Sequence, residues 1–239
     1  MSSEIITFNK DNLNKYLSEL AKRYRKISGG RIRAEIILIG GASVLVNYGF
    51  RDSTSDMDAI ILAASCMQEA IYYVAEKHKL PDKWLNADFK RTTSYSQKLI
   101  QFSEHYKTFS NIMDVRTIRG EYLLAMKLVS GRKYKNDLSD IIGIVKDERN
   151  KGNTITMEKL NAAMEDLYGG WDNVTEELKA FADKVLSVDN LDDYFNAIRA
   201  NEIKTREEIL QFREDNPEDS KRKTANEILE ELKKKEKTI

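Results

Sequence analysis

The chain has 239 residues with 39 acidic and 39 basic side chains, so its formal net charge is zero. Hydrophobic residues make up 41% of it and prolines number only two, which excludes collagen-like and wholly disordered proteins. A single cysteine excludes an internal disulfide and a cysteine-rich zinc site, and two histidines disfavour a multi-histidine metal site or a histidine-based catalytic triad.

The first 145 residues predict a mixture of helices and strands. Apolar residues at helical spacing predict helices, and short β-branched runs predict buried strands. The predicted helices cover residues 13–24, 42–48, 65–79, 120–129 and 138–145. The predicted strands cover residues 34–39, 57–62, 84–89, 98–102 and 111–118. This mixture indicates the α/β (α+β) class.

Beyond residue 145 the apolar pattern is almost purely helical. The predicted helices cover residues 157–167, 174–186, 191–200, 203–212 and 221–237. The last of them carries lysines around one apolar face and is expected to fray or to contact a partner. We therefore expect a mixed domain over 1–145 and a helical domain over 146–239 that ends in a basic helix.

Charge is unevenly distributed along the chain. Residues 1–143 hold 22 Lys and Arg against 16 Asp and Glu, whereas residues 144–239 hold 17 against 23. A basic first part suits a polyanionic ligand such as a nucleotide or RNA, although a solvated surface can also carry such an imbalance. No apolar run reaches the roughly 18 residues of a membrane span, and residues 1–10 do not resemble a secretory signal. We therefore expect a cytoplasmic protein with no membrane contact.

One short segment combines a strand, two glycines and a helix. The predicted strand at 34–39 runs into Gly40 and Gly41, and a helix that contains Ser43 follows. Glycine lets a phosphate approach the main chain, and the positive end of the helix dipole favours negative charge there. This pattern alone is weak evidence, since many folds place two glycines after a strand and a full phosphate-binding motif is missing.

Two aspartates open the next predicted strand. Asp56 and Asp58 are two residues apart, so their carboxylates point to the same face of that strand. Paired carboxylates repel each other unless a cation lies between them, and Mg²⁺ is commonly held by one or two carboxylates together with substrate phosphates. The alternative is an acidic turn at the entry of a strand.

These residues together resemble the polymerase-β-like nucleotidyltransferase superfamily. Gly40-Gly41-x-Ser43 followed by Asp56-x-Asp58 looks like its signature, and the surroundings are similar to bacterial minimal nucleotidyltransferases, including abortive-infection and toxin–antitoxin toxins of the AbiE type. A second block resembles the lysine-containing helix and downstream aspartates of that group. It contains residues 121–128 with Lys127, then Gly131-Arg132, then Asp137-x-x-Asp140. The resemblance covers residues 34–145.

The resemblance implies a nucleotidyltransferase fold with a mixed sheet and a transfer of NMP from an NTP to an acceptor hydroxyl. Asp56 and Asp58 would hold Mg²⁺, with two ions expected, while Lys127 would neutralise phosphate charge. The expected nucleotide-binding residues are Gly40, Gly41, Ser43, Arg51 and Thr54. The acceptor would be an RNA such as tRNA or a protein, and the toxin group further implies an antitoxin partner.

The family also uses a third carboxylate, for which this sequence offers three candidates. Asp114 lies in a strand-like apolar context, Asp137 follows the lysine block, and Asp88 is closer to the pair but on a less regular segment. We place Asp114 with the metal ligands and retain Asp137 as a further catalytic candidate. Asp140 is more consistent with a helix cap or with a partner of a basic residue.

Two rival functions remain open at this point. One is a non-catalytic module of the same fold that binds RNA or a partner protein. The other is a dinucleotide-binding domain, because Asp58 follows the glycines at about the distance expected for a ribose-binding acid. The paired Asp56 and the later lysine block count against the second rival. Arg51 could contact a phosphate or the acceptor, or could pair with Asp52 in an exposed loop.

Overall fold

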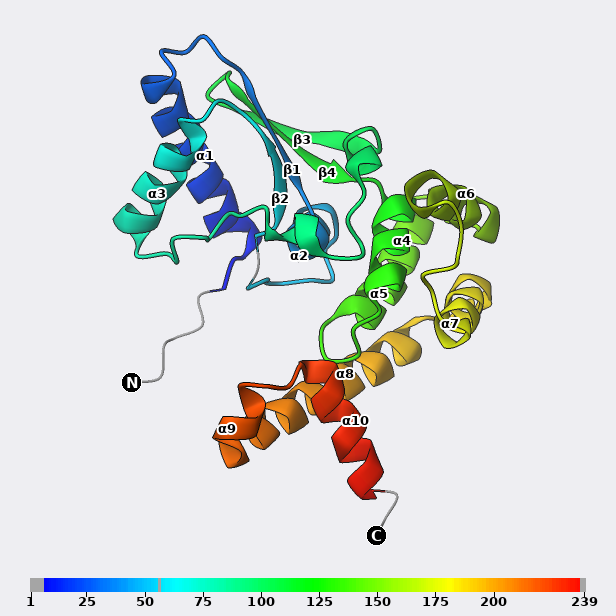
Figure 1. Ribbon diagram of the computed structural model, residues 1–239. Coiled ribbons are helices and arrows are strands. Elements are labelled where there is room, and N and C mark those ends of the chain that lie inside the picture. Colours follow the sequence, from blue (N-terminus) through cyan, green and yellow to red (C-terminus); the bar gives the residue numbers. More distant parts are fainter. Residues whose placement is uncertain (1–6, 56, 237–239) are drawn as a thin grey trace.

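The computed structural model describes residues 7–55 and 57–236, and the predicted metal ligand Asp56 lies outside them. Four strands form one sheet in the order β2-β1-β4-β3 (Figure 1). They are β1 (Ala34–Leu38), β2 (Ala59–Leu62), β3 (Ser103–Phe109) and β4 (Met113–Ile118). β1 is parallel to β4, whereas the β1–β2 and β3–β4 pairs are antiparallel. The mixed sheet expected from the sequence is therefore confirmed.

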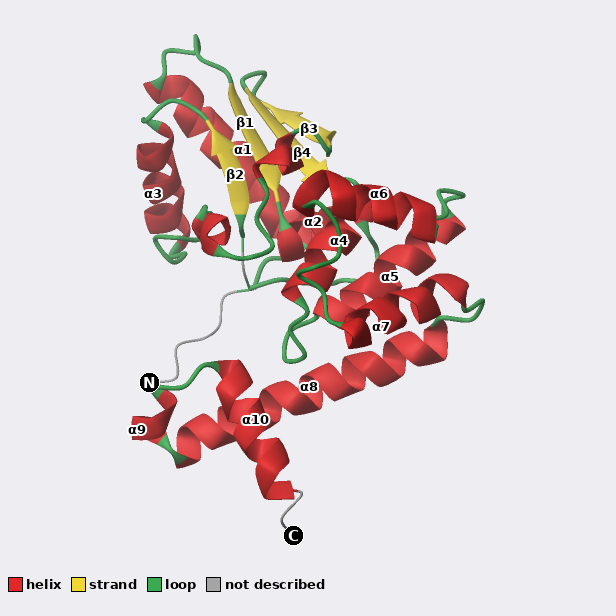
Figure 2. Ribbon diagram, turned by 45° about the vertical axis from the view of Figure 1, so that its right-hand side comes forward, coloured by secondary structure: helices red, strands yellow, loops and turns green. Residues whose placement is uncertain are grey.

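Helices surround the sheet and make up most of the second half of the chain (Figure 2). The α-helices are α1 (Lys10–Ile27), α2 (Gly40–Asn47), α3 (Met67–His78), α4 (Gly120–Ser130), α5 (Asp137–Asn150), α6 (Met157–Tyr168), α7 (Glu176–Ser187), α8 (Asp192–Asp215), α9 (Pro217–Ser220) and α10 (Ala225–Glu236). Two 3₁₀ helices, Asp88–Arg91 and Gln97–Ile100, precede β3. The α/β class predicted from the sequence is confirmed.

Alternation along the strands divides the core into two layers. Ile36 and Leu38 face one side of the sheet, where they pack with α1 and α3. Ile37, Ile60 and Ile118 face the other side, where they pack with the apolar residues of α4 and α5. Figure 1 shows α1 and α3 together on one side of the sheet and α4 to α7 on the other.

The second layer continues without interruption into the helical part of the chain. The cluster that contains Ile37 also includes Leu160 of α6, Val185 of α7 and Leu191, all of them buried. The predicted domain boundary at 145/146 falls inside α5. The two-domain division itself remains a prediction.

Two predicted strands are wrong. Residues 84–89 form no strand but one isolated bridge, between Asn86 and Asp58, and the Asn86 side chain accepts the Asp88 N–H at 2.8 Å and turns the chain. Residues 98–102 instead overlap the 3₁₀ helix Gln97–Ile100 and continue into a turn. Leu99 and Phe102 are three residues apart, and this spacing places both side chains on one side of a 3₁₀ turn.

The sequence pattern does not predict β3, and two helices predicted separately form the single helix α8. β3 is an edge strand whose exposed positions, such as Glu104 and Lys107, are polar, so it lacks an apolar pattern. The predicted helices 191–200 and 203–212 merge into α8 because no glycine or proline separates them. Among the described residues, no helix is both long enough and apolar enough to span a membrane.

Candidate functional site

A glycine corner connects β1 to α2. Gly40 has φ +53°, in the left-handed region that residues with a side chain rarely adopt, and it begins α2 directly after the strand. The N–H of Ile39 donates to the carbonyl of Asp58 at 2.9 Å, which fixes the start of β2 beside this corner. The backbone thus brings Asp58 next to the two glycines, as the sequence pattern predicted.

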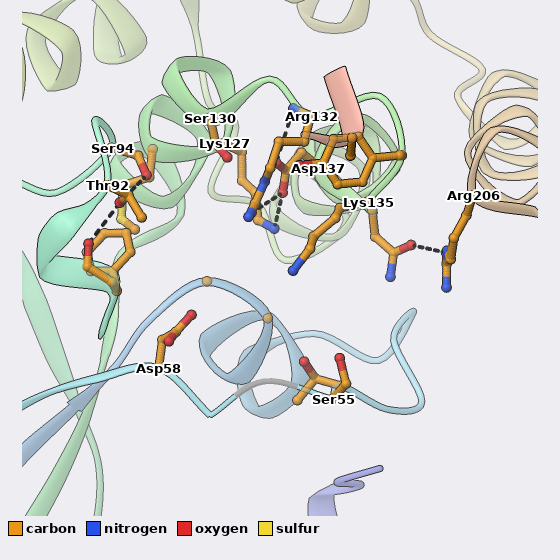
Figure 3. Close-up of a pocket in the computed structure, with 18 of the residues that line it drawn as sticks. Ser55, Asp58, Thr92, Ser94, Lys127, Ser130, Arg132, Lys135, Asp137 and Arg206 are labelled. Atoms are coloured by element: carbon orange, nitrogen blue, oxygen red, sulfur yellow. Dashed lines mark hydrogen bonds and ion pairs between the residues drawn. The ribbon is translucent and has the colours of Figure 1, made fainter. Parts of the chain in front are cut away.

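A cavity of about 640 Å³ opens in front of this corner. Gly40, Gly41 and Asp58 form its floor, and the 92–94 segment lines one side. The end of α4 and the loop before α5 form the wall that faces this floor. Figure 3 shows Asp58 and Ser55 facing Lys127, Arg132 and Lys135 across the cavity, with Arg206 of α8 at its edge. Four parts of the chain that are far apart in sequence therefore meet here.

The lining of the cavity is strongly basic. Its charged side chains, among the described residues, are the acids Asp58 and Asp137 and seven bases. The bases are Arg51, Arg91, Lys127, Arg132, Lys135, Arg206 and Arg213. Positive charge concentrated within a concave surface raises the local concentration of anions. The cavity therefore suits a ligand with several negative charges.

Lys127 lies at the centre of a buried ion-pair cluster. Its ammonium is 2.8 Å from Asp137 and 2.8 Å from Asp140, both on the first turn of α5. Arg132 pairs with Asp137 at 2.8 Å, and Arg51 pairs with Asp140 at 2.5 Å. The expectation that Asp140 partners a basic residue is confirmed. Three bases thus meet two acids, which leaves the cluster with net positive charge beside the cavity.

Mutual attraction within the cluster keeps Asp137 and Lys127 charged. Burial raises the pKa of Asp137, but Lys127 and Arg132 outweigh burial and hold that pKa well below its usual range. Burial likewise lowers the pKa of Lys127, but Asp137 and Asp140 outweigh it and raise that pKa. Lys127 is therefore a permanent cation at the cavity wall at neutral pH.

Arg51 and Thr54 belong to a loop beneath the glycine corner. Arg51 is mostly buried, and it donates to Asp140 and to the carbonyl of Ser53 rather than pairing with Asp52. Thr54 is held by two backbone hydrogen bonds with Phe8, of 2.7 and 2.9 Å. Both Arg51 and Thr54 line the cavity, and their binding of a nucleotide remains a prediction.

Three sequence candidates lie elsewhere. Asp114 is paired in register with Glu35, which lies five residues or roughly 16 Å along the chain from Gly40, and it accepts from Thr108 at 2.6 Å. Asp88 is exposed and pairs with Lys83 at 3.3 Å. Ser43 is fully buried, and its hydroxyl accepts the Ile118 N–H at 3.1 Å, so it does not line the cavity.

Of the three candidates for the third carboxylate, the structure therefore brings only Asp137 to the cavity. Asp137 is already bound to Lys127 and Arg132, which suits a residue that positions cations. Within residues 7–55 and 57–236, no three His, Cys, Asp or Glu side chains are grouped as a metal site. Asp58 faces the cavity and supplies the kind of oxygen ligand that Mg²⁺ accepts alongside substrate phosphates.

Comparison with known protein families assigns the chain to one family. Residues 15–182 match the family described as nucleotidyltransferase of unknown function (DUF6036). The chain belongs to this family. No curated protein and no solved structure matches the chain. The superfamily resemblance drawn from the glycine and aspartate motifs is thus supported at the level of a nucleotidyltransferase family.

One wall of the cavity lies beyond the segment that matches DUF6036. Arg206, Leu210 and Arg213 line the cavity from α8, and Ala225 lines it from α10. These residues are not among those predicted from the sequence, although Arg206, Leu210 and Arg213 follow the i, i+4, i+7 spacing of one helix face. Nothing in the sequence pattern of residues 92–94 indicates that this segment lines the same cavity.

A substitution at Gly41 tests how tightly the glycine corner of this DUF6036 member packs against the loop beneath it. A Cβ at this position would lie 2.5 Å from Thr54 Oγ1 and 3.0 Å from an Arg51 Nη atom. We expect Gly41→Ala to displace both side chains and to lower the free energy of unfolding by about 1–3 kcal/mol. Denaturant unfolding measures this change. Gly49→Ala is the control, because a Cβ there meets nothing within 4 Å.

Proposed function

We propose that this member of DUF6036 transfers an NMP group from an NTP to an acceptor hydroxyl in a Mg²⁺-dependent reaction. The acceptor hydroxyl oxygen would bond to the α-phosphorus and release its proton to solvent, while the bond from that phosphorus to the bridging oxygen breaks and pyrophosphate leaves. The observation that carries this proposal is a single basic cavity that contains the glycine corner, Asp58 and the charged Lys127.

The lining supports a triphosphate as the ligand. Gly40 and Gly41 leave the main chain open at the start of α2, where backbone N–H groups and the helix dipole favour anions. Lys127, Arg132 and Lys135 face this corner from the opposite wall (Figure 3). A phosphate chain between the two walls would be held by main-chain donors on one side and by cations on the other.

Asp58 would hold the metal ion, and the sequence motif adds Asp56, two residues earlier, as its expected partner. Mg²⁺ bound there would neutralise charge on the phosphates and stabilise the charge that develops during transfer. The superfamily resemblance implies a second Mg²⁺ ion, and we include that ion in this proposal. The chain's own contribution is the placement of Asp58 and Lys127 on opposite sides of the phosphate-binding space.

An RNA such as tRNA, or a protein, is the proposed acceptor class. The seven basic residues of the cavity favour a polyanionic acceptor, and the motif resemblance to AbiE-type toxins suggests a toxin–antitoxin or phage-defence role with an antitoxin partner. These finer assignments rest on the motifs and on the charge of the cavity.

Label transfer tests the proposed function. The full chain is incubated with Mg²⁺, each of the four α-³²P-labelled NTPs, and separate pools of total RNA and of protein. We expect label on one pool with one or more NTPs and complete loss of labelling with excess EDTA. Absence of transfer to both pools, combined with nucleotide or RNA binding that is indifferent to Mg²⁺, would instead favour a non-catalytic module.

A further inference from the structure

Helix α5 begins without a cap from its own N-terminal residue. The first N–H groups of a helix have no partner within the helix, and a side chain at the N-cap position commonly accepts one of them. Here the N-cap residue is Asn136, whose side chain makes no such bond and instead accepts from Arg206 at 3.1 Å. The first turn of α5 therefore depends on another part of the chain.

Glu202 of α8 supplies the missing acceptor. One carboxylate oxygen accepts the N–H of Leu138 at 2.9 Å and the N–H of Ser139 at 3.1 Å. The other oxygen accepts the Ser139 hydroxyl at 2.5 Å. The Glu202 side chain is almost completely buried, so these bonds form away from bulk water.

The same helical turn carries the partners of Lys127. Asp137 and Asp140 lie on either side of Leu138 and Ser139, and both bind the Lys127 ammonium. The backbone of this turn is thus held by α8, while its side chains hold the cation at the cavity wall. A shift of the turn would move both carboxylates together and release Lys127.

We propose that Glu202 is a positioning residue that caps α5 from α8 and thereby holds Lys127 in place at the cavity. Glu202 lies beyond the segment that matches DUF6036, so a part of the chain outside that segment orients a residue inside it. The role of Lys127 toward phosphate rests on the proposed function, whereas the contact between Glu202 and α5 does not.

Replacement by glutamine separates capping from charge. Burial and the neighbouring Asp140 raise the pKa of Glu202 to about 7, although its bonds to Ser139 and Leu138 act in the opposite direction. Other charged groups near it are Arg199, which donates to the Ser139 hydroxyl at 3.2 Å, and Arg206 on Asn136. A neutral amide of the same shape keeps an oxygen for both N–H groups, so Glu202→Gln preserves the cap and Glu202→Ala removes it.

The test measures acylation of Lys127 in the full chain with N-hydroxysuccinimide acetate, followed by peptide mass spectrometry. We expect Lys127 to react at least about a hundredfold more slowly than the exposed Lys98 in the wild type. Glu202→Ala should raise the Lys127 rate at least about tenfold, the effect of losing hydrogen bonds to a buried turn. Glu202→Gln and the control Glu207→Gln, at an exposed position on α8, should stay within about threefold of wild type.

Hydrogen exchange keeps the test valid if Glu202→Ala does not fold. Amides at the second and third positions of an uncapped helix exchange rapidly. We expect slow exchange at Leu138 and Ser139 in the wild type and in Glu202→Gln. Rapid exchange in the wild type, or an unchanged Lys127 rate in folded Glu202→Ala, would overturn the proposal.

A binding measurement separates this inference from the proposed function. Inorganic tripolyphosphate with Mg²⁺ should bind wild type and Glu202→Gln alike, and Glu202→Ala at least about tenfold more weakly. Equal binding by folded Glu202→Ala contradicts the positioning role. A wild type that binds no tripolyphosphate counts against the proposed function, while the acylation rates still decide whether Glu202 positions Lys127.

Discussion

Asp58→Ala is expected to lower nucleotide transfer at least about a thousandfold while the protein remains folded. Asp58 faces the basic cavity from the glycine corner, where its carboxylate is the described metal-binding candidate. Loss of several kcal/mol of charge stabilisation at the phosphates corresponds to this factor. The measurement is the rate of transfer from the labelled NTP that gives product with the wild type.

Asp52→Ala is the matched control for this prediction. Asp52 is an exposed aspartate of the loop that precedes Asp58, and we expect its loss to leave the transfer rate within about twofold of wild type. Melting curves of both variants show whether the fold persists. Undiminished transfer by a folded Asp58→Ala protein would remove Asp58 from the proposed mechanism.

Lys127→Met is expected to lower the free energy of unfolding by about 3 kcal/mol. The substitution leaves Asp137 and Asp140 buried, each with one remaining basic partner, Arg132 and Arg51 respectively. Breaking a buried ion pair from one side costs roughly 3–5 kcal/mol, and the remaining partners favour the lower end. Urea unfolding at pH 7 measures the change.

Two further variants test this explanation. Lys133→Met removes a lysine of the loop between α4 and α5, whose exposed ion pair with Glu177 spans 2.7 Å, and it should cost less than about 1 kcal/mol. Lys127→Met combined with Asp140→Asn should recover part of the lost stability, because one uncompensated charge is removed. Equal losses in Lys127→Met and Lys133→Met would show that burial of the cluster contributes little.

The cluster also gives the wild type a defined response to acid. The native pKa of Asp137 lies below its unfolded value near 3.8, so its contribution is fully present above that value. Stability is lost as the pH falls from about 4 through the native pKa. In Lys127→Met this acid-dependent loss becomes smaller, because the native pKa of Asp137 moves back toward 3.8.

Much of the fold could be predicted because the spacing of apolar residues along the sequence indicates which side chains are buried. Strands β1 and β4 are buried along most of their length, as are Ala59 and Ile60 of β2, and their apolar runs predict them well. β3 at the sheet edge carries mostly exposed or half-buried polar residues without regular alternation, and its strand state depends on pairing with β4. Residues 98–102 were assigned wrongly because an apolar pair three residues apart also fits a 3₁₀ turn.

Some residues of the candidate site could likewise be predicted from local sequence, and others could not. The glycine corner and Asp58 lie within one short strand–helix–strand segment and are neighbours in space, so a local motif locates them. The positions of Asp114 and Asp137 depend on strand register and on helix packing, which no local pattern encodes. The contact from Glu202 to α5 joins residues more than 60 positions apart and carries no sequence signal.

The attachment of the last helix has a consequence for access to the cavity. The described core that holds α10 against α8 contains three buried side chains, Ile209, Phe212 and Ile228. A helix held by so small a core detaches at a free-energy cost far below that of global unfolding. Because Ile209 and Ala225 also line the cavity, transient detachment of α10 would widen the entrance for a bulky substrate without any rearrangement of the sheet.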